Sequence, residues 1–291
     1  MQTALPNFVI IGAMKCGTST LHEQLARQPG IFMSEPKEPN FFSNAEIYAQ
    51  GEGWYRSLFA ANGGAALRGE SSTHYTKLPT YPQTITRMRA LLPQLKLIYL
   101  MRHPIDRLVS HYIHEWSMRV IGCPIDEALE AHPELVAYSC YHEQLQPFFE
   151  AYGRDNVLPV FLERMHAQPQ SELERVCRFL SYQGSPRWID DVAQQNVSSE
   201  RLRLGGLGRK LFEDPRLAQL RRAVVPQFIR DALKERLTMK QRPELSAPRR
   251  GQLVVRFDAD LAKLGAELGT ELRCSSWKER VLGAELEWKR A

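Results

Sequence analysis

The sequence predicts an α/β fold: a three-layer arrangement with a central parallel sheet of about five strands flanked by helices, followed by a helical C-terminal region. Two observations predict it. Short apolar, β-branched runs alternate along the chain with segments of helical period. The strand candidates are apolar on both faces, as in sheets covered by helices on both sides. We expect one domain over 1–291, with an α/β core at 1–165 and a mostly helical region at 166–291.

The strands are predicted from short apolar runs. The first run, Asn-Phe-Val-Ile-Ile, is apolar on both faces and stops at Gly12, where a loop begins. Two prolines between 35 and 40 make that segment a loop. In chain order, strands are predicted at 7–11, 31–33, 67–70, 96–101 and 157–162.

The helices are predicted from periodicity and proline placement. Leu21 and Leu25 share one face of the first helix, which stops before Pro29. Pro82 and Pro104 each stand in the first turn of a later helix. Helices are predicted at 18–28, 54–60, 82–92, 104–119, 135–152 and 170–180, and largely helical chain follows a basic, glycine-rich segment at 198–210, with breaks at Pro215, Pro226, Pro243 and Pro248.

Composition narrows the function classes. Apolar residues make up 43% and charged residues 24%, which excludes a disordered polyelectrolyte. The 38 basic and 33 acidic residues give a net charge of +5, which favours an anionic partner. The basic residues stand singly instead of in a long stripe, so nucleic acid is not expected. No apolar run approaches the roughly 20 residues of a membrane helix, and no signal peptide is visible. We expect no stable membrane insertion and a cytoplasmic location.

Cysteine and histidine spacing gives no metal signature. The five cysteines form no C-x-x-C pair, so reduced thiols are expected, although a Cys123–Cys140 disulfide stays open. His111 and His114 are three residues apart but lack a third ligand, so no metal site is expected.

The loop after the first strand is suited to an anion. Gly12-Ala-Met-Lys-Cys-Gly-Thr-Ser nearly matches the phosphate loop, and glycines there let the backbone and a helix N-terminus surround an anion. The fold is therefore expected to be P-loop-like. Thr18 stands where nucleoside-triphosphate loops have lysine, and the lysine is inside the loop at Lys15. The strand at 97–101 ends in Arg102, not in an acidic magnesium ligand, so ATP–Mg²⁺ machinery looks incomplete.

Four segments together resemble the sulfotransferases that use 3′-phosphoadenosine 5′-phosphosulfate (PAPS). Residues 8–21 resemble the 5′-phosphosulfate loop of that family, and 97–112 resemble its 3′-phosphate element. Residues 37–42 resemble the E-x-x-F-F segment of the heparan-sulfate-type branch. Gly-Glu-Ser-Ser-Thr-His-Tyr at 69–75 resembles G-E-x-S-P-x-Y, with Thr73 in place of proline. The matches span roughly 7–165, in the family's order.

The resemblance implies PAPS as donor, PAP as product and no required metal. Lys15 would stabilise the leaving 5′-phosphate, and Arg102 and Ser110 would hold the 3′-phosphate. A third contact would come from the basic segment at 201–210, whose order departs from the family pattern. The implied donor-binding residues are Lys15, Cys16, Gly17, Thr18, Ser19, Thr20, Arg102, Ser110, Arg201, Arg209 and Lys210.

The same resemblance implies a carboxylate base. Glu38 stands at the position of the base in the heparan-sulfate-type branch, and Lys37 would keep it ionised. His114, one turn after Ser110, would assist or orient the acceptor, and His74 is the rival base. Acceptor contacts are expected from Lys37, Phe41, His74 and Tyr75, although aromatics at such spacing usually belong to the core.

The leading hypothesis is sulfuryl transfer to a hydroxyl of a sugar, glycolipid or other small metabolite. A polyketide β-hydroxyl is an alternative acceptor. A phosphate-loop kinase or NTPase and a nucleotide-binding scaffold without catalysis are the alternatives from other classes. The acceptor and the oligomeric state stay open.

Overall fold

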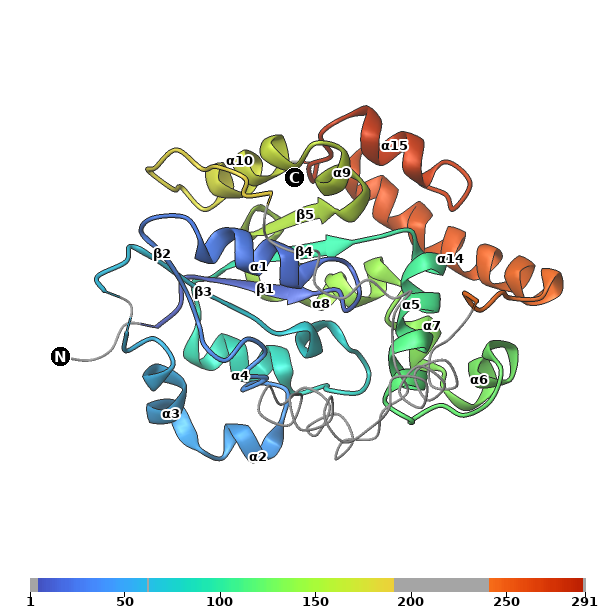
Figure 1. Cartoon of the computed structure of the whole chain (residues 1–291), viewed down its shortest axis with the longest axis horizontal. Helices are drawn as coiled ribbons and strands as arrows, with labels where there is room; N and C mark the ends of the chain where they lie inside the picture. The colour runs from blue at the N-terminus through green and yellow to red at the C-terminus, as the bar shows by residue number, and fades with distance from the viewer. Residues whose placement is uncertain (1–4, 62, 191–240, 290–291) are drawn as a thin grey trace, which may run out of the picture.

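The computed structural model describes residues 5–61, 63–190 and 241–289, and its centre is a five-stranded sheet (Figure 1). The strand order is β2-β3-β1-β4-β5, and every neighbouring pair is parallel. The predicted parallel sheet flanked by helices is thereby confirmed. The strands are β1 (Phe8–Gly12), β2 (Ile31–Met33), β3 (Leu67–Ser71), β4 (Lys96–Met101) and β5 (Val157–Phe161).

The helices before β4 are short, and the longer ones follow it. Helices between β1 and β4 are α1 (Thr18–Ala26), α2 (Ala45–Tyr48), α3 (Gly51–Ser57), the 3₁₀ turn η1 (Thr73–Thr76) and α4 (Thr84–Leu91). Between β4 and β5 lie α5 (Pro104–Ser117), α6 (Ile125–Ala131), α7 (Glu134–Ala137), α8 (Tyr141–Tyr152) and the 3₁₀ turn η2 (Arg154–Asn156). After β5 come α9 (Leu162–Ala167), α10 (Pro169–Phe179), α14 (Ala247–Leu268) and α15 (Trp277–Gly283).

The connections between strands reverse direction beside β1. The crossover from β1 through α1 leads to β2 on one side, whereas the chain leaves β4 for β5 on the other. Right-handed crossovers therefore place α1 on one face of the sheet and α4 and α8 on the other (Figure 1). Parallel sheets bind ligands beyond the carboxyl ends of the strands at such a reversal point, so the region beyond β1 and β4, which we call the crevice, is the expected ligand site.

Tertiary contacts change several predicted boundaries. The helix predicted at 135–152 is two helices, α7 and α8, because the segment between them bends to meet a buried guanidinium. Arg107 of α5 donates from Nε to Ser139 Oγ and from Nη2 to the Leu135 carbonyl. The predicted strand at 157–162 ends at Phe161, and α9 begins immediately afterwards. The short helices α2 and α6 were not predicted, since neither is long enough to show a period.

The C-terminal helix α14 packs against α8 and α5. The buried Asp260 of α14 accepts hydrogen bonds from the backbone N–H groups of His142 and Glu143, at 3.0 and 3.1 Å, and so caps the first turn of α8. Pro248 does not break a helix as predicted, because it lies in the first turn of α14 after the N-cap Ser246. Among the described residues, no helix is long and apolar enough to cross a membrane.

Candidate active site

The loop at 12–17, between β1 and α1, forms one wall of the crevice. Its first N–H group, that of Ala13, donates to the Leu100 carbonyl of β4 at 2.7 Å, so the loop is tied to the neighbouring strand. Gly12 has a φ of 153°, and a Cβ there would lie 2.0 Å from Thr76 Oγ1. Gly17 has a φ of 87°, and its Cβ would lie 2.7 Å from Leu162 Cδ1. Both positions therefore require glycine.

The first turn of α1 faces the same crevice without a side-chain cap. Its orphan N–H groups and the helix dipole favour an anion at this end. Lys15 adopts a left-handed φ of 71° and is partly exposed, as are Ser19 and Thr20. The Cys16 thiol is fully buried, and burial raises its pKa to about 12, so only the backbone of this residue can serve a ligand. Of the predicted phosphate-loop residues, Lys15, Cys16 and Gly17 thus lie in the loop, and Thr18, which is buried, Ser19 and Thr20 form the first turn of α1.

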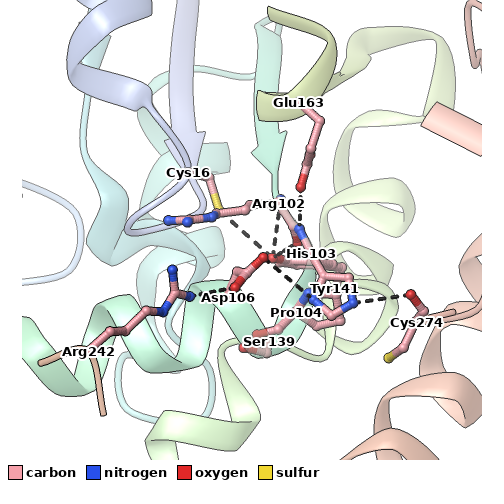
Figure 2. Close-up of polar contacts among 10 residues, drawn as sticks. All are labelled: Cys16, Arg102, His103, Pro104, Asp106, Ser139, Tyr141, Glu163, Arg242 and Cys274. Atoms are coloured by element: carbon pink, nitrogen blue, oxygen red, sulfur yellow. Dashed lines mark hydrogen bonds and ion pairs between the residues drawn. The ribbon is translucent and has the colours of Figure 1, made fainter. Parts of the chain in front are cut away.

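One buried hydroxyl connects this loop to the second wall of the crevice. Tyr141 Oη donates to the Arg102 carbonyl at 2.6 Å and accepts from the Arg102 N–H at 3.3 Å (Figure 2). The same hydroxyl lies 3.8 Å from Cys16 Sγ. The Arg102 side chain extends toward Cys16 in Figure 2. The loop after β1 and the arginine after β4 are therefore held at a fixed separation.

The structure describes only some of the other residues that were predicted to contact PAPS. Ser110 is buried on α5, and His114 is half-buried one turn further along the same helix. The predicted contacts Arg201, Arg209 and Lys210 lie outside the described residues.

Glu38 is held by two hydrogen-bond donors. Lys37 Nζ lies 2.7 Å from Glu38 Oε1, and Thr73 Oγ1 donates to Oε2 at 3.2 Å. The Glu38 N–H donates to the Ser71 carbonyl at the end of β3, which brings the loop to the sheet. Burial raises the pKa of this carboxyl. The Lys37 charge and both hydrogen bonds together lower it by more than burial raises it, so the pKa of Glu38 lies below its usual value. Thr73, the departure from the family's proline, is thus a partner of Glu38.

Two histidines near Glu38, the buried His22 and the half-buried His74, are held neutral. Burial lowers the pKa of His22 and of His74 to about 4 in each case, and nearby lysines lower it further. His22 Nδ1 lies 2.8 Å from Ser71 Oγ, and His74 stacks on Tyr81. His74, the rival base, is therefore neutral near pH 7 and able to accept a proton.

Three polar residues near Glu38 were not predicted: His22, Lys77 and Glu115. Lys77 and Glu115 act electrostatically on His74, and Lys77 and Glu38 act on each other. His22 follows Thr18 by one helical turn, so helical spacing alone could have placed it near the loop. The positions of Lys77 and Glu115 depend on tertiary packing that local patterns do not record.

Two predicted acceptor contacts belong to an aromatic core cluster. Phe41 is 1% exposed and stacks on Tyr55 with ring centroids 4.7 Å apart. Tyr75 is fully buried and contacts Phe42. Both side chains therefore pack in the core, as aromatic residues at such spacing commonly do, and are closed to an acceptor.

All five cysteines are free thiols, as expected, and Cys123 and Cys140 form no disulfide. Within the described ranges, one group has metal-ligating atoms close together: Cys140, Glu143 and Asp260. Asp260 already caps α8, and burial raises the pKa of the Cys140 thiol to about 12. This group serves the packing of α14 on α8.

Comparison with known proteins agrees with this geometry. The model of a family described as the sulfotransferase domain matches residues 5–202. The chain belongs to this family. The predicted resemblance is confirmed. Most elements of the crevice, from the loop after β1 through α10, lie within the matched residues.

The relatives and the solved structures add detail. Human bifunctional heparan sulfate N-deacetylase/N-sulfotransferase 2 is 27% identical over 216 residues, covering 64% of this chain and 24% of that protein. Mouse heparan sulfate glucosamine 3-O-sulfotransferase 3B1 is 30% identical over 200 residues, covering 64% and 48%. The chain thus spans a quarter to a half of these relatives. A sulfotransferase structure from Alicyclobacillus acidocaldarius covers 94% of this chain and 99% of its own, with 23% identity and a TM-score of 0.65, which supports the fold.

Proposed function

We propose that this sulfotransferase moves a sulfuryl group from PAPS to a hydroxyl of a sugar-containing acceptor. The family match supports the reaction class. The names of the relatives, heparan sulfate N- and 3-O-sulfotransferases, support a carbohydrate acceptor. The alternative acceptor, a polyketide β-hydroxyl, would use the same donor site and the same base.

The crevice is suited to a nucleotide with phosphate at both ends. The loop at 12–17 and the uncapped start of α1 would hold the 5′-phosphosulfate, with Lys15 beside the leaving oxygen. Arg102, Ser110 and a basic contact from 201–210 would hold the 3′-phosphate. Tyr141 would keep these two sites at the correct separation, because its hydroxyl contacts both walls.

The observation that carries the proposal is the setting of Glu38. Its carboxylate is kept ionised by Lys37 and Thr73, and it lies in a loop bound to β3 beside the crevice. In the proposed step, Glu38 takes the proton from the acceptor hydroxyl as that oxygen forms a bond to sulfur. The bond between sulfur and the 5′-phosphate oxygen breaks, and PAP leaves with the electron pair. His114 would orient the acceptor.

No metal is required in this scheme. A sulfuryl group carries less charge than a terminal phosphoryl group, so Lys15 and backbone N–H groups suffice for the charge on the leaving phosphate. The proposal is therefore tested in EDTA. Transfer of labelled sulfate from PAPS is measured on a panel of neutral and acidic sugars, glycolipids and a β-hydroxyacyl thioester.

Labelled product from a sugar, formed in EDTA, is the expected result. Product from the thioester alone would replace the sugar acceptor by the polyketide one. Transfer that needs Mg²⁺ would contradict the metal-free mechanism, and absence of PAP binding would contradict the proposal as a whole.

A further inference from the structure

Lys77 is a buried cation without a direct partner. Its side chain follows η1 and is only 8% exposed. Across the described part of the chain, its ammonium makes no hydrogen bond and no ion pair, and it lies over the Tyr138 ring, 5.8 Å from Nζ to the centroid. The ammonium is not among the polar atoms that are shut off from solvent, so a ligand can reach it, and a largely desolvated charge gains from a ligand that supplies a hydrogen-bond acceptor.

The backbone holds Lys77 rigidly beside the crevice. Thr76 donates from Oγ1 to the Ile11 carbonyl of β1, next to Gly12. On the other side, the Leu78 N–H donates to Gln144 Oε1 at 2.8 Å, and Gln144 Nε2 donates back to the Leu78 carbonyl at 2.9 Å. Lys77 therefore follows a segment fixed against the phosphate loop.

The charges that face Lys77 leave it without a close anion. Glu38 and Glu115 attract it and Arg107 repels it, while His74 and His111 lie near it as neutral rings. Glu38 is already bound to Lys37 at 2.7 Å, and Glu115 lies 3.4 Å from His111 Nε2.

The charged side chains around Lys77 carry a net positive charge. Together with Lys77 they are three cations, Lys37, Lys77 and Arg107, and two carboxylates, Glu38 and Glu115, so one positive charge stays uncompensated. An anionic oxygen on a ligand would complement this balance.

We propose that the Lys77 ammonium binds an anionic oxygen, a carboxylate or a sulfate, carried by the acceptor beside the hydroxyl that faces Glu38. Lys77 thereby selects acidic sugars over neutral ones. This inference rests on the proposed function for the place of the acceptor, but it predicts binding that is measurable without turnover. Burial lowers the pKa of Lys77 to about 8, and an anion bound to it would raise that pKa again.

Competitive acetylation of the full chain tests the inference directly. A limiting amount of acetic anhydride is added between pH 6 and pH 10, with and without saturating PAP, and modification of each lysine is measured by peptide mass mapping. The probes are p-nitrophenyl β-D-glucuronide, glucose 6-sulfate and the neutral p-nitrophenyl β-D-glucoside. Exposed Lys263 of α14 is the internal reference.

Lys77 is expected to react in the folded protein, with a midpoint near pH 8 that rises when an acidic sugar is bound. Either the glucuronide or the 6-sulfate should slow its acetylation at least fivefold, which identifies the anionic group, and the glucoside should not. Lys77 that stays unreactive until the protein unfolds would overturn the proposal, because the side chain would be sealed. Equal protection by all three sugars, or by none, would also overturn it.

A variant provides the second readout. Lys77→Met keeps the length of the side chain and removes the charge, and Lys263→Met is the matched control. The expected result is a loss of affinity for the protecting sugar of about 10- to 100-fold, with PAP affinity unchanged and a melting temperature no lower than that of the wild type. Unchanged sugar affinity in Lys77→Met would contradict the proposal. Loss of PAP binding by the wild-type protein would instead refute the proposed function.

Discussion

The ammonium of Lys37 lies 2.7 Å from Oε1 of Glu38, its neighbour in the chain. Glu38 itself has a left-handed φ of 57°, so the two side chains converge across a strained turn. Thr73, 35 residues later, binds the other carboxylate oxygen. This setting, which keeps the carboxylate ionised, is the one that the proposed role of Glu38 in proton abstraction requires.

Replacing Glu38 by Gln should abolish most of the turnover. The amide keeps the shape of the side chain but cannot take the proton, so kcat should fall by about 10²- to 10⁴-fold. PAP affinity, measured by calorimetry, should stay within about twofold of the wild type. Glu35→Gln, an exposed change in the same loop, is the matched control. Equal turnover in Glu38→Gln and wild type would transfer the role of base to His74 or His114.

Replacing Lys37 by Met should move the acid limb of the pH–rate profile upward. Burial raises the pKa of Glu38, and Lys37 is the main influence that opposes it. Activity is lost as the pH falls through the pKa of Glu38, so the acid limb of kcat/KM should move to higher pH when the Lys37 charge is removed. Thr73→Val should shift it less, in the same direction, and Lys37→Arg should leave it nearly unchanged. A limb that stays in place in Lys37→Met would show that Glu38 does not set it.

Replacing Arg102 by Ala should weaken PAP binding by about 10- to 100-fold, because a charge-assisted phosphate contact contributes about 1.5–3 kcal/mol. The fold should persist, since the contacts of Arg102 with Tyr141 use only its backbone. Calorimetric titration with PAP and a thermal melt measure both quantities. Arg178→Ala, at an exposed guanidinium on α10, serves as control. Full PAP affinity in Arg102→Ala would refute the 3′-phosphate assignment.

Replacing Tyr141 by Phe should affect both walls of the crevice at once. The variant loses one hydroxyl that donates to the Arg102 carbonyl and lies near Cys16. We expect a loss of about 1–3 kcal/mol in the free energy of unfolding, because the buried Arg102 carbonyl loses its donor. PAP should bind more weakly even below the melting temperature. Unchanged PAP affinity despite lower stability would show that the hydroxyl serves folding alone.

The sequence alone was sufficient to predict the sheet and the donor loop, because both depend on local patterns. β1 is a continuous apolar run, and the glycines of the loop stand where the backbone must turn. The break between α7 and α8 could not be predicted, since it depends on Arg107, which lies far away in sequence. The short helix α9 also could not be predicted, because it follows β5 directly and no turn residue separates the two elements.

The site was predicted to the extent that motifs carry it. Glu38 and Arg102 stand at motif positions; in the structure the Glu38 backbone is bound to the end of β3, and Arg102 directly follows β4. Thr73 looked like a departure from the motif, and only the fold brings its hydroxyl to Glu38. Lys77 belongs to no motif, and its neighbours Thr76 and Leu78 are bound to β1 and α8 by contacts that no local pattern records. Phe41 shows the opposite case: it stands at a motif position, but its ring packs in the core.

The central claim is that the crevice between the loop at 12–17 and Arg102 binds PAPS without a metal. Isothermal titration in EDTA tests it most directly, with PAP as one titrant and ATP, with and without Mg²⁺, as the other. We predict that PAP binds at one site per chain in EDTA and that ATP binds much more weakly under every condition. Binding of ATP only with Mg²⁺, with no binding of PAP, would contradict the account and favour a phosphate-loop kinase or NTPase.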